Sequence, residues 1–271
     1  MDRGYDRSMH ESAYEHGRQF FELYWNPRFT DVVELGSQDV NGTLRDHAPK
    51  SAVYLGLDMI DAEGVDIVVT PGKPLPLPDA SSDVIVTSSA FEHDACFWET
   101  FLDLLRVLRP GGLLYINAPS NGAFHRYPVD CWRLYPDAGV GLVEWATRNG
   151  MEVDLVESFI AEPQESGWAD FIAIFRKAGP PLLRKGSMSD LSKSMNVRDI
   201  EKTGLQRESE RTFDMIATEE ARKNLSASEA ELAEVQAANS ALQTALAALT
   251  SSTSWKITAF ARRLSSVVKG H

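Results

Sequence analysis

The 271-residue chain has only two cysteines, Cys96 and Cys131, and their spacing does not fit a metal site. It also lacks long apolar runs, since none approaches the roughly 18 residues that a membrane-spanning helix needs. The first residues, MDRGYDRSMH, do not contain the apolar run of a secretion signal. These absences argue against a secreted or membrane-spanning protein. We therefore expect a protein of the reducing cytoplasm.

Basic residues are scarce as well. Lysine and arginine together number 27 against 39 aspartates and glutamates, which gives a formal net charge of -12. Because binding to nucleic acid needs clustered positive charge, we expect no nucleic-acid partner. The last 22 residues are the exception, since their only charged side chains are the cations Lys256, Arg262, Arg263 and Lys269.

The order of apolar segments predicts an α/β fold. Short, mostly aliphatic segments alternate with segments of helical periodicity, and two final strands are joined by a loop too short for a crossover helix. We expect a doubly wound, Rossmann-like sheet of seven strands with a terminal antiparallel pair. The predicted strands are 31–35, 51–57, 66–69, 83–87, 113–118, 151–159 and 168–176, and the predicted helices are 10–25, 43–47, 97–109 and 137–148.

Composition predicts four parts along the chain. Residues 1–177 should form the α/β domain, and the segment 178–198 reads as a flexible linker because it is rich in Gly, Pro, Ser, Lys and Arg. Residues 199–250 should form a helical coiled coil, and residues 251–271 a basic amphipathic tail.

The stretch 31–42, DVVELGSQDVNG, reads as a buried strand that runs into a glycine turn. Gly36 leaves bare backbone against which a ligand can lie. The next strand ends at Asp58, which is placed to accept both hydroxyls of a ribose, with a helix cap or a surface acid as the alternative. In open α/β sheets ligands bind at such strand ends.

Four segments, in this order and spacing, resemble the class I S-adenosylmethionine-dependent methyltransferases: VVELGSQDVNG, YLGLDM, SSDVIVTSSAFEHD and LLRVLRPGGLLYINAP. The resemblance covers roughly residues 28–177 and implies S-adenosylmethionine as cofactor. This molecule has a cationic sulfonium, a ribose and an amino-acid end but no phosphate, so its site needs carboxylates and close backbone. The cofactor-binding residues expected are Glu34, Gly36, Ser37, Gln38, Asp58, Met59 and Ser89, and no metal is expected.

The chain departs from the family pattern at two positions. Gln38 replaces the usual second glycine, and Thr70 lies where many relatives carry an acid near the adenine. The resemblance implies that Glu34 helps to hold the methionyl amine, while a buried acid satisfied by backbone amides is the alternative. Ser88 and Ser89 should border the transferred methyl, unless they are simply a polar strand end.

Methyl transfer to oxygen is an in-line displacement that also requires removal of a proton. The loop 119–136 leaves the fifth strand on the ligand side of the sheet and contains His125, our first candidate for the base, and Asp130, the second. Packing within the loop is the alternative role for His125, and arginines of this loop could clamp an acidic substrate. We interpret His93, in the FEHD turn, as a structural residue at a helix start.

We predict a methyltransferase that acts on a small-molecule or glycan acceptor, and we expect the acceptor group to be a hydroxyl of a sugar or glycolipid intermediate of surface polysaccharide. A non-catalytic, methyltransferase-like scaffold that recruits glycan-assembly enzymes is the alternative, and Gln38 and Thr70 favour it. A nicotinamide dehydrogenase shares the early βαβ unit and Asp58 but expects a fuller GxGxxG motif.

The second half of the chain shows a heptad pattern from residue 225 to 249. One apolar position is occupied by Leu225, Leu232, Asn239 and Leu246, and the other by Ser228, Val235, Leu242 and Leu249. Because a buried asparagine in such a seam favours two parallel strands, we expect a homodimer through this helix. An alanine-rich helix lying on its own domain is the alternative.

The basic end of the chain, SSTSWKITAFARRLSSVVKG, has apolar residues along one side: Ile257, Phe260, Ala261, Leu264 and Val268. Such a helix could lie on the anionic inner surface of a membrane. The end is also similar to a short terminal signature, Ser-Trp-basic-Ile-Thr, of bacterial glycosyltransferases and surface-polysaccharide assembly proteins. That similarity implies contact with a glycosyltransferase, although Phe260 replaces the usual proline.

Overall fold

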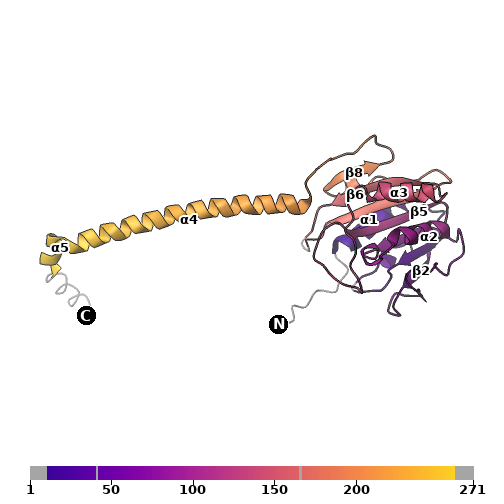
Figure 1. The fold of residues 1–271 in the computed structure, drawn as a ribbon, viewed down its shortest axis with the longest axis horizontal. Coiled ribbons are helices and arrows are strands. Elements are labelled where there is room, and N and C mark those ends of the chain that lie inside the picture. Colours follow the sequence, from indigo (N-terminus) through magenta and orange to yellow (C-terminus); the bar gives the residue numbers. More distant parts are fainter. Residues whose placement is uncertain (1–10, 41, 165–166, 260–271) are drawn as a thin grey trace. The chain divides into compact units, whose positions relative to one another are not determined.

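The computed structural model describes residues 11–40, 42–164 and 167–259. The chain divides after Phe213 into two compact units. The first unit contains a single sheet with helices on both faces, and the second is built around one long helix (Figure 1).

Eight strands form one mixed sheet in the order β3-β2-β1-β4-β5-β7-β6-β8. The first five strands of the chain pair in parallel, whereas β7 pairs antiparallel with β5 and β6, and β8 pairs antiparallel with β6. The strands are β1 (Asp31–Leu35), β2 (Val53–Asp58), β3 (Ile67–Val68), β4 (Ser82–Ser88), β5 (Leu108–Pro119), β6 (Val153–Ala161), β7 (Asp170–Lys177) and β8 (Ser194–Asp199). The Rossmann-like α/β class is thus confirmed, with eight strands in place of the seven predicted.

Helices cover both faces of this sheet because its strands alternate their side chains between two apolar layers. On one face α1 (Glu11–Tyr24) buries Phe20 and Tyr24 in a cluster that includes Ile174 of β7. The next residue of that strand, Phe175, points the other way and meets Phe101 of α2 (Phe97–Val107), with ring centroids 4.9 Å apart. The other short helices are η1 (Leu44–His47), η2 (Phe91–His93), α3 (Ala138–Arg148) and η3 (Met188–Asp190).

The segment predicted to be a flexible linker, residues 178–198, has structure in the first unit. It contains η3 and most of β8, and its backbone binds the buried carboxylate of Glu157, which accepts hydrogen bonds from the N–H groups of Met188 and Ser189, both at 2.9 Å. Asp199 at the end of β8 is paired with Arg184 at 2.8 Å. Polar composition concealed these contacts, because the buried partners lie far away in the sequence.

We expect a chain that ends at Lys177 to be much less stable than one that ends at Phe213. The shorter chain loses the donors that satisfy Glu157, and an uncompensated buried carboxylate costs about 3 kcal/mol or more. Thermal unfolding followed by circular dichroism should show a midpoint lower by about 10 °C or no cooperative transition. Equal midpoints for the two chains would contradict this interpretation of residues 178–213.

The second unit contains α4 (Phe213–Ser251), a helix of 39 residues that is about 58 Å long at roughly 1.5 Å per residue. It begins later than the coiled coil predicted from residue 199. None of its residues is buried, and the heptad residue Leu242 is 70% exposed. A short helix, α5 (Thr253–Ile257), follows. The tail residues from Phe260 onward lie outside the described part of the chain.

In the part of the chain that the structure describes, we find no helix with the length and apolarity that crossing a bilayer demands.

Candidate functional site

The carboxyl ends of the parallel strands meet at one edge of the sheet. Leu35, the last residue of β1, is in register with Leu57 of β2 and with Thr87 of β4. Ser88 at the end of β4 is in register with Asn117 of β5. The turns that follow these strands are therefore neighbours, which is where such folds bind their ligands.

The turn after β1 packs closely against its neighbours. Gly36 has a φ of +85°, and a Cβ added there would lie 2.9 Å from the Cβ of Ala90, just after β4. The N–H groups of Gly36 and Ser37 both donate to the carbonyl of Leu57, at 2.8 and 3.1 Å. Glycine is needed at position 36 because a side chain would have both a strained backbone and a steric clash.

Asp58 lies directly beside this turn. Its Oδ2 accepts a hydrogen bond from the backbone N–H of Gln38 and its Oδ1 one from Ile60, each at 3.2 Å, and the residue is 8% exposed. Each carboxylate oxygen can accept more than one hydrogen bond, so both keep capacity for ligand hydroxyls. The bend after residue 35 and the carboxylate at position 58, which the sequence analysis placed together, are thus in contact.

Three buried hydroxyls near the strand ends have no hydrogen-bond partner in the described chain: Ser37 Oγ, Thr87 Oγ1 and Ser88 Oγ. Buried polar atoms are nearly always paired, so these three indicate that a polar group belongs beside them. With the carboxylate of Asp58, the residues present fit a cofactor that has hydroxyl, amine and carboxylate groups. Met59 follows Asp58 and is half-buried, while Ser89 is exposed at the end of β4 with a φ of +51°.

Glu34 has partners within the protein. Its Oε2 accepts hydrogen bonds from Tyr54 Oη at 2.8 Å and from Thr43 Oγ1 at 3.5 Å. Burial raises the pKa of the Glu34 carboxyl to about 7. The structure is thus close to the alternative role for Glu34, a buried acid whose hydrogen bonds are made within the protein. Most of its donors are side-chain hydroxyls, whereas backbone amides were expected. A direct contact of Glu34 with the methionyl amine stays a prediction.

We expect the E34Q variant to have a different pH dependence of stability. In the folded protein Glu34 ionises near pH 7, whereas in the unfolded chain it ionises near its ordinary 4.5. Its contribution to the free energy of unfolding is therefore complete below pH 4.5 and is lost as the pH rises to 7, by up to about 3 kcal/mol. Urea unfolding between pH 4.5 and pH 8 should show that the free energy of unfolding of E34Q increases relative to that of the wild type as the pH rises. The exposed control E63Q should keep a constant difference, and a constant difference for E34Q would refute the assignment.

The loop 119–136 closes over the same edge of the sheet. Tyr127 Oη donates to Gln38 Oε1 at 2.7 Å, which ties the loop to the turn after β1. The backbone N–H of Cys131 donates to the carbonyl of Glu92 at 2.7 Å, which ties the loop to η2 after β4. Both contacts place the loop on the ligand side, as the sequence predicted.

His125 and Asp130 lie together within this loop. The backbone N–H of His125 donates to Asp130 Oδ2 at 2.7 Å, and His125 Nδ1 lies 3.5 Å from the same oxygen. Arg133 donates to both carboxylate oxygens of Asp130, at 2.6 and 2.9 Å. These hydrogen bonds hold the pKa of Asp130 at about 2, so its carboxylate is suited to orient His125.

Two residues overlooked as functional in the sequence analysis join this group. Glu92 is 1% exposed, and the ring of His93 lies against that of His125, with centroids 4.9 Å apart. Burial raises the pKa of the Glu92 carboxyl to about 8 and lowers that of the His93 imidazole. The position of the FEHD turn in the sequence could have indicated that Glu92 and His93 belong to the site. This turn follows β4 just as the loop 119–136 follows the neighbouring β5.

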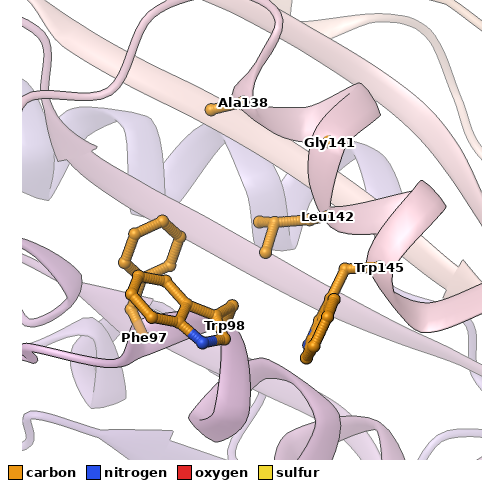
Figure 2. A pocket seen from close by; sticks show the side chains of 6 residues that line it. All are labelled: Phe97, Trp98, Ala138, Gly141, Leu142 and Trp145. Atoms are coloured by element: carbon orange, nitrogen blue, oxygen red, sulfur yellow. The ribbon is translucent and has the colours of Figure 1, made fainter. Parts of the chain in front are cut away.

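A separate aromatic pocket of about 370 Å³ lies between the start of α2 and α3 (Figure 2). Trp98 and Trp145 lie on opposite sides of it. The ring of Trp98 also contacts that of Trp132 in the loop 119–136, with centroids 5.7 Å apart. The pocket is lined by Phe97, Trp98, Ala138, Gly141, Leu142 and Trp145.

Comparison with known proteins bears on the first unit. Residues 36–116 match the family model described as a methyltransferase domain, a span that includes the turn after β1, Asp58 and the strands β2 to β4. The match supports the resemblance to class I S-adenosylmethionine-dependent methyltransferases and confirms S-adenosylmethionine as the cofactor. No curated protein matches the chain.

Several solved structures are similar at low identity. The 1,6-didemethyltoxoflavin-N1-methyltransferase of Burkholderia thailandensis, with bound 1,6-didemethyltoxoflavin and S-adenosylhomocysteine, is 14% identical over 62% of this chain and 80% of its own, with a TM-score of 0.47. A SAM-dependent methyltransferase from Archaeoglobus fulgidus is 15% identical over 64% and 96%, with a TM-score of 0.47. The [4+2]-cyclase SpnF is 15% identical over 66% and 86%, also with a TM-score of 0.47. Likenesses this distant identify no acceptor.

Proposed function

We propose that this protein transfers the methyl group of S-adenosylmethionine to a hydroxyl of a sugar or glycolipid intermediate of surface polysaccharide. The observation that carries the proposal is the contact between the turn after β1 and Asp58, with Gln38 N and Asp58 Oδ2 3.2 Å apart. When bound, the cofactor supplies a methyl group made electrophilic by the sulfonium.

The residues of this chain hold the cofactor in the following roles. Asp58 accepts the ribose hydroxyls, and the backbone of Gly36, Ser37 and Gln38 lies against the methionine end. Ser89, with the buried hydroxyl of Ser88, borders the transferred methyl. No basic side chain is needed, because the cofactor has no phosphate, and the nearby carboxylate favours its cationic sulfonium.

His125 takes the proton of the acceptor hydroxyl. Its Nδ1 faces Asp130 Oδ2 at 3.5 Å and the carbonyl of Ala123 at 3.3 Å, which leaves Nε2 as the basic nitrogen when Nδ1 carries the hydrogen. In this arrangement the carboxylate orients the imidazole, and the imidazole acts as the base. Asp130 is then a positioning residue, fixed by Arg133.

Aromatic side chains support a sugar as acceptor. Trp132 belongs to the loop that contains His125, and Trp98 links it to the aromatic pocket of α2 and α3. Tryptophan rings suit the apolar face of a sugar because they bury area at low entropic cost and can donate a hydrogen bond.

The direct test is transfer of a labelled methyl group from S-adenosylmethionine to cell-envelope extracts that contain polysaccharide intermediates. The proposal predicts label in a base-stable glycan or glycolipid product that depends on active protein. Label that appears only in protein or in small metabolites would refute the sugar acceptor and leave methyl transfer intact.

A non-catalytic scaffold is the second candidate, and the hydrogen bond from Tyr127 to Gln38 favours it. The bond spans the turn at the place where the family has a second glycine, so it could occupy space that the methionine end needs. Thermal unfolding with and without S-adenosylmethionine distinguishes the two functions. A rise in the midpoint supports the enzyme, and no change supports the scaffold.

We also propose that α4 pairs with the same helix of a second chain through residues 225–249. Its leucines are exposed by more than half in the single chain, and Asn239 lies in the same seam. Sedimentation equilibrium should give a dimer mass for the full chain and a monomer mass for a chain that ends at Phe213. Equal monomer masses would refute the pairing.

The tail contact is a proposal too. We propose that residues 251–271 bind either an anionic membrane surface or a glycosyltransferase. Flotation with anionic liposomes, with and without these residues, separates the two, because only the membrane contact makes flotation depend on the tail.

A further inference from the structure

Glu92, His93 and His125 form a cluster that the proposed methyl transfer does not fully use. Each offers one ligand atom, and these atoms all lie within 4.8 Å of one another. Two ligands of one ion at bond lengths near 2.1 Å can be at most about 4.2 Å apart. Small side-chain movements, of about 1 Å or less, would therefore close the three atoms around an ion.

The carboxylate of Glu92 gives an independent indication of a missing partner. The residue is 1% exposed, and its Oε2 has no hydrogen-bond partner in the described chain. Its Oε1 lies 3.7 Å from His93 Nε2, which is beyond hydrogen-bond distance. A cation would satisfy a buried carboxylate that has one oxygen near an imidazole and the other oxygen without a donor.

The second nitrogen of each imidazole is already engaged. His93 Nδ1 lies 2.5 Å from the carbonyl of Val129, which fixes the hydrogen on Nδ1 and directs the Nε2 lone pair to the Glu92 side. His125 Nδ1 faces the carbonyl of Ala123 and the carboxylate of Asp130. Metal-binding histidines are held in this way by carbonyls and carboxylates of the surrounding residues.

The charges around the cluster allow a cation. The guanidinium of Arg133 is the nearby positive group, and its charge is matched by two hydrogen bonds to Asp130. The His125 side chain is 34% exposed, whereas Glu92 is buried, so one side of the cluster is open to a fourth ligand. Three protein ligands and an open position are typical of sites where the metal meets a substrate.

We propose that Glu92, His93 and His125 bind one divalent first-row transition-metal ion. Two imidazoles and one carboxylate suit Zn²⁺ or Fe²⁺, whereas Mg²⁺ and Ca²⁺ prefer oxygen ligands throughout. The three residues come from the turns after β4 and β5, which are adjacent strands, so the rigid sheet sets their spacing.

The metal site also bears on the proposed methyl transfer, through deprotonation of the acceptor hydroxyl. Only this part of the inference rests on the proposed function. An acceptor hydroxyl bound to the ion loses its proton more readily. His125 would then hold the ion, and the proton would pass to solvent. Metal binding itself does not depend on methyl transfer.

The test is uptake of Zn²⁺ by the untagged full-length protein, measured by isothermal titration and by metal content after dialysis. We expect one ion per chain in the wild type and at least a 10-fold weaker affinity in H93Q and in H125Q. H47Q, which changes a histidine outside the cluster, should bind as the wild type does. Mg²⁺ in excess should not displace the ion.

Two results would overturn the site: no stoichiometric uptake by the folded wild type, or wild-type affinity in both H93Q and H125Q. Because Glu92 is buried, E92Q could fail to fold, so the two histidine variants decide the matter. S-adenosylmethionine binding, measured on the same samples, separates the proposals. Cofactor binding without metal refutes the metal site alone, and metal binding without cofactor refutes the methyltransferase function alone.

Discussion

The D58N variant should bind S-adenosylmethionine about 100-fold more weakly than the wild type. Asparagine keeps an oxygen that can accept the backbone N–H of Gln38 or Ile60, so the turn after β1 should survive. It loses the negative charge, and hydrogen bonds to a charged acceptor contribute about 1.5 to 3 kcal/mol each. Two ribose hydroxyls that lose such an acceptor account for the expected factor.

Isothermal titration with S-adenosylmethionine measures this change. D61N is the matched control, because Asp61 is an exposed acid three residues further along the same turn. Its affinity should stay within about 2-fold of the wild type, as for surface changes that touch no ligand. Similar affinities for D58N and wild type would mean that Asp58 has the alternative role, a cap for the turn.

The H125Q variant should lower the turnover number by about 10² to 10⁴, the range that a positioned acid or base contributes. Affinity for S-adenosylmethionine should not change, since His125 lies on the loop 119–136 and not on the turns that we propose hold the cofactor. Steady-state kinetics measures the turnover number and isothermal titration measures the affinity for S-adenosylmethionine, with H47Q as the control for both.

Turnover that is unchanged in both H125Q and D130N would remove the assignment of the base. If H125Q loses turnover and metal together, its role is that of a ligand. If it loses turnover in a protein that never bound metal, its role is that of a base. The D130N variant should lower turnover less than H125Q, because the role that we propose for Asp130 is to orient the imidazole.

The core of the fold could be predicted from sequence because local pattern and global topology agree in it. The aliphatic strand before Gly36, the strand that ends at Asp58 and the short loop before β7 each have a strong local signal. The ends of parallel strands meet at one edge of the sheet, so the contact between the turn after β1 and Asp58 follows from their places in the chain.

Features that depend on distant partners could not be predicted. Strand β8 and η3 lie in a segment whose polar composition indicated a linker, because nothing local reveals that Met188 and Ser189 donate to Glu157. The hydrogen bonds that Glu34 accepts from Tyr54 and Thr43 are likewise a result of packing between elements. The contact of His93 with His125 could not be predicted either, because it joins the turn after β4 to the loop after β5.

The most direct test of the account is a crystal structure of the protein with S-adenosylhomocysteine. We expect the ribose hydroxyls to lie within hydrogen-bond distance of the Asp58 carboxylate and the amino-acid end to lie against the backbone of residues 36–38. The account would be contradicted by a nucleoside bound elsewhere on the sheet. It would also be contradicted if crystals grown with saturating S-adenosylhomocysteine showed no ligand and a turn after β1 still closed by the hydrogen bond from Tyr127 to Gln38.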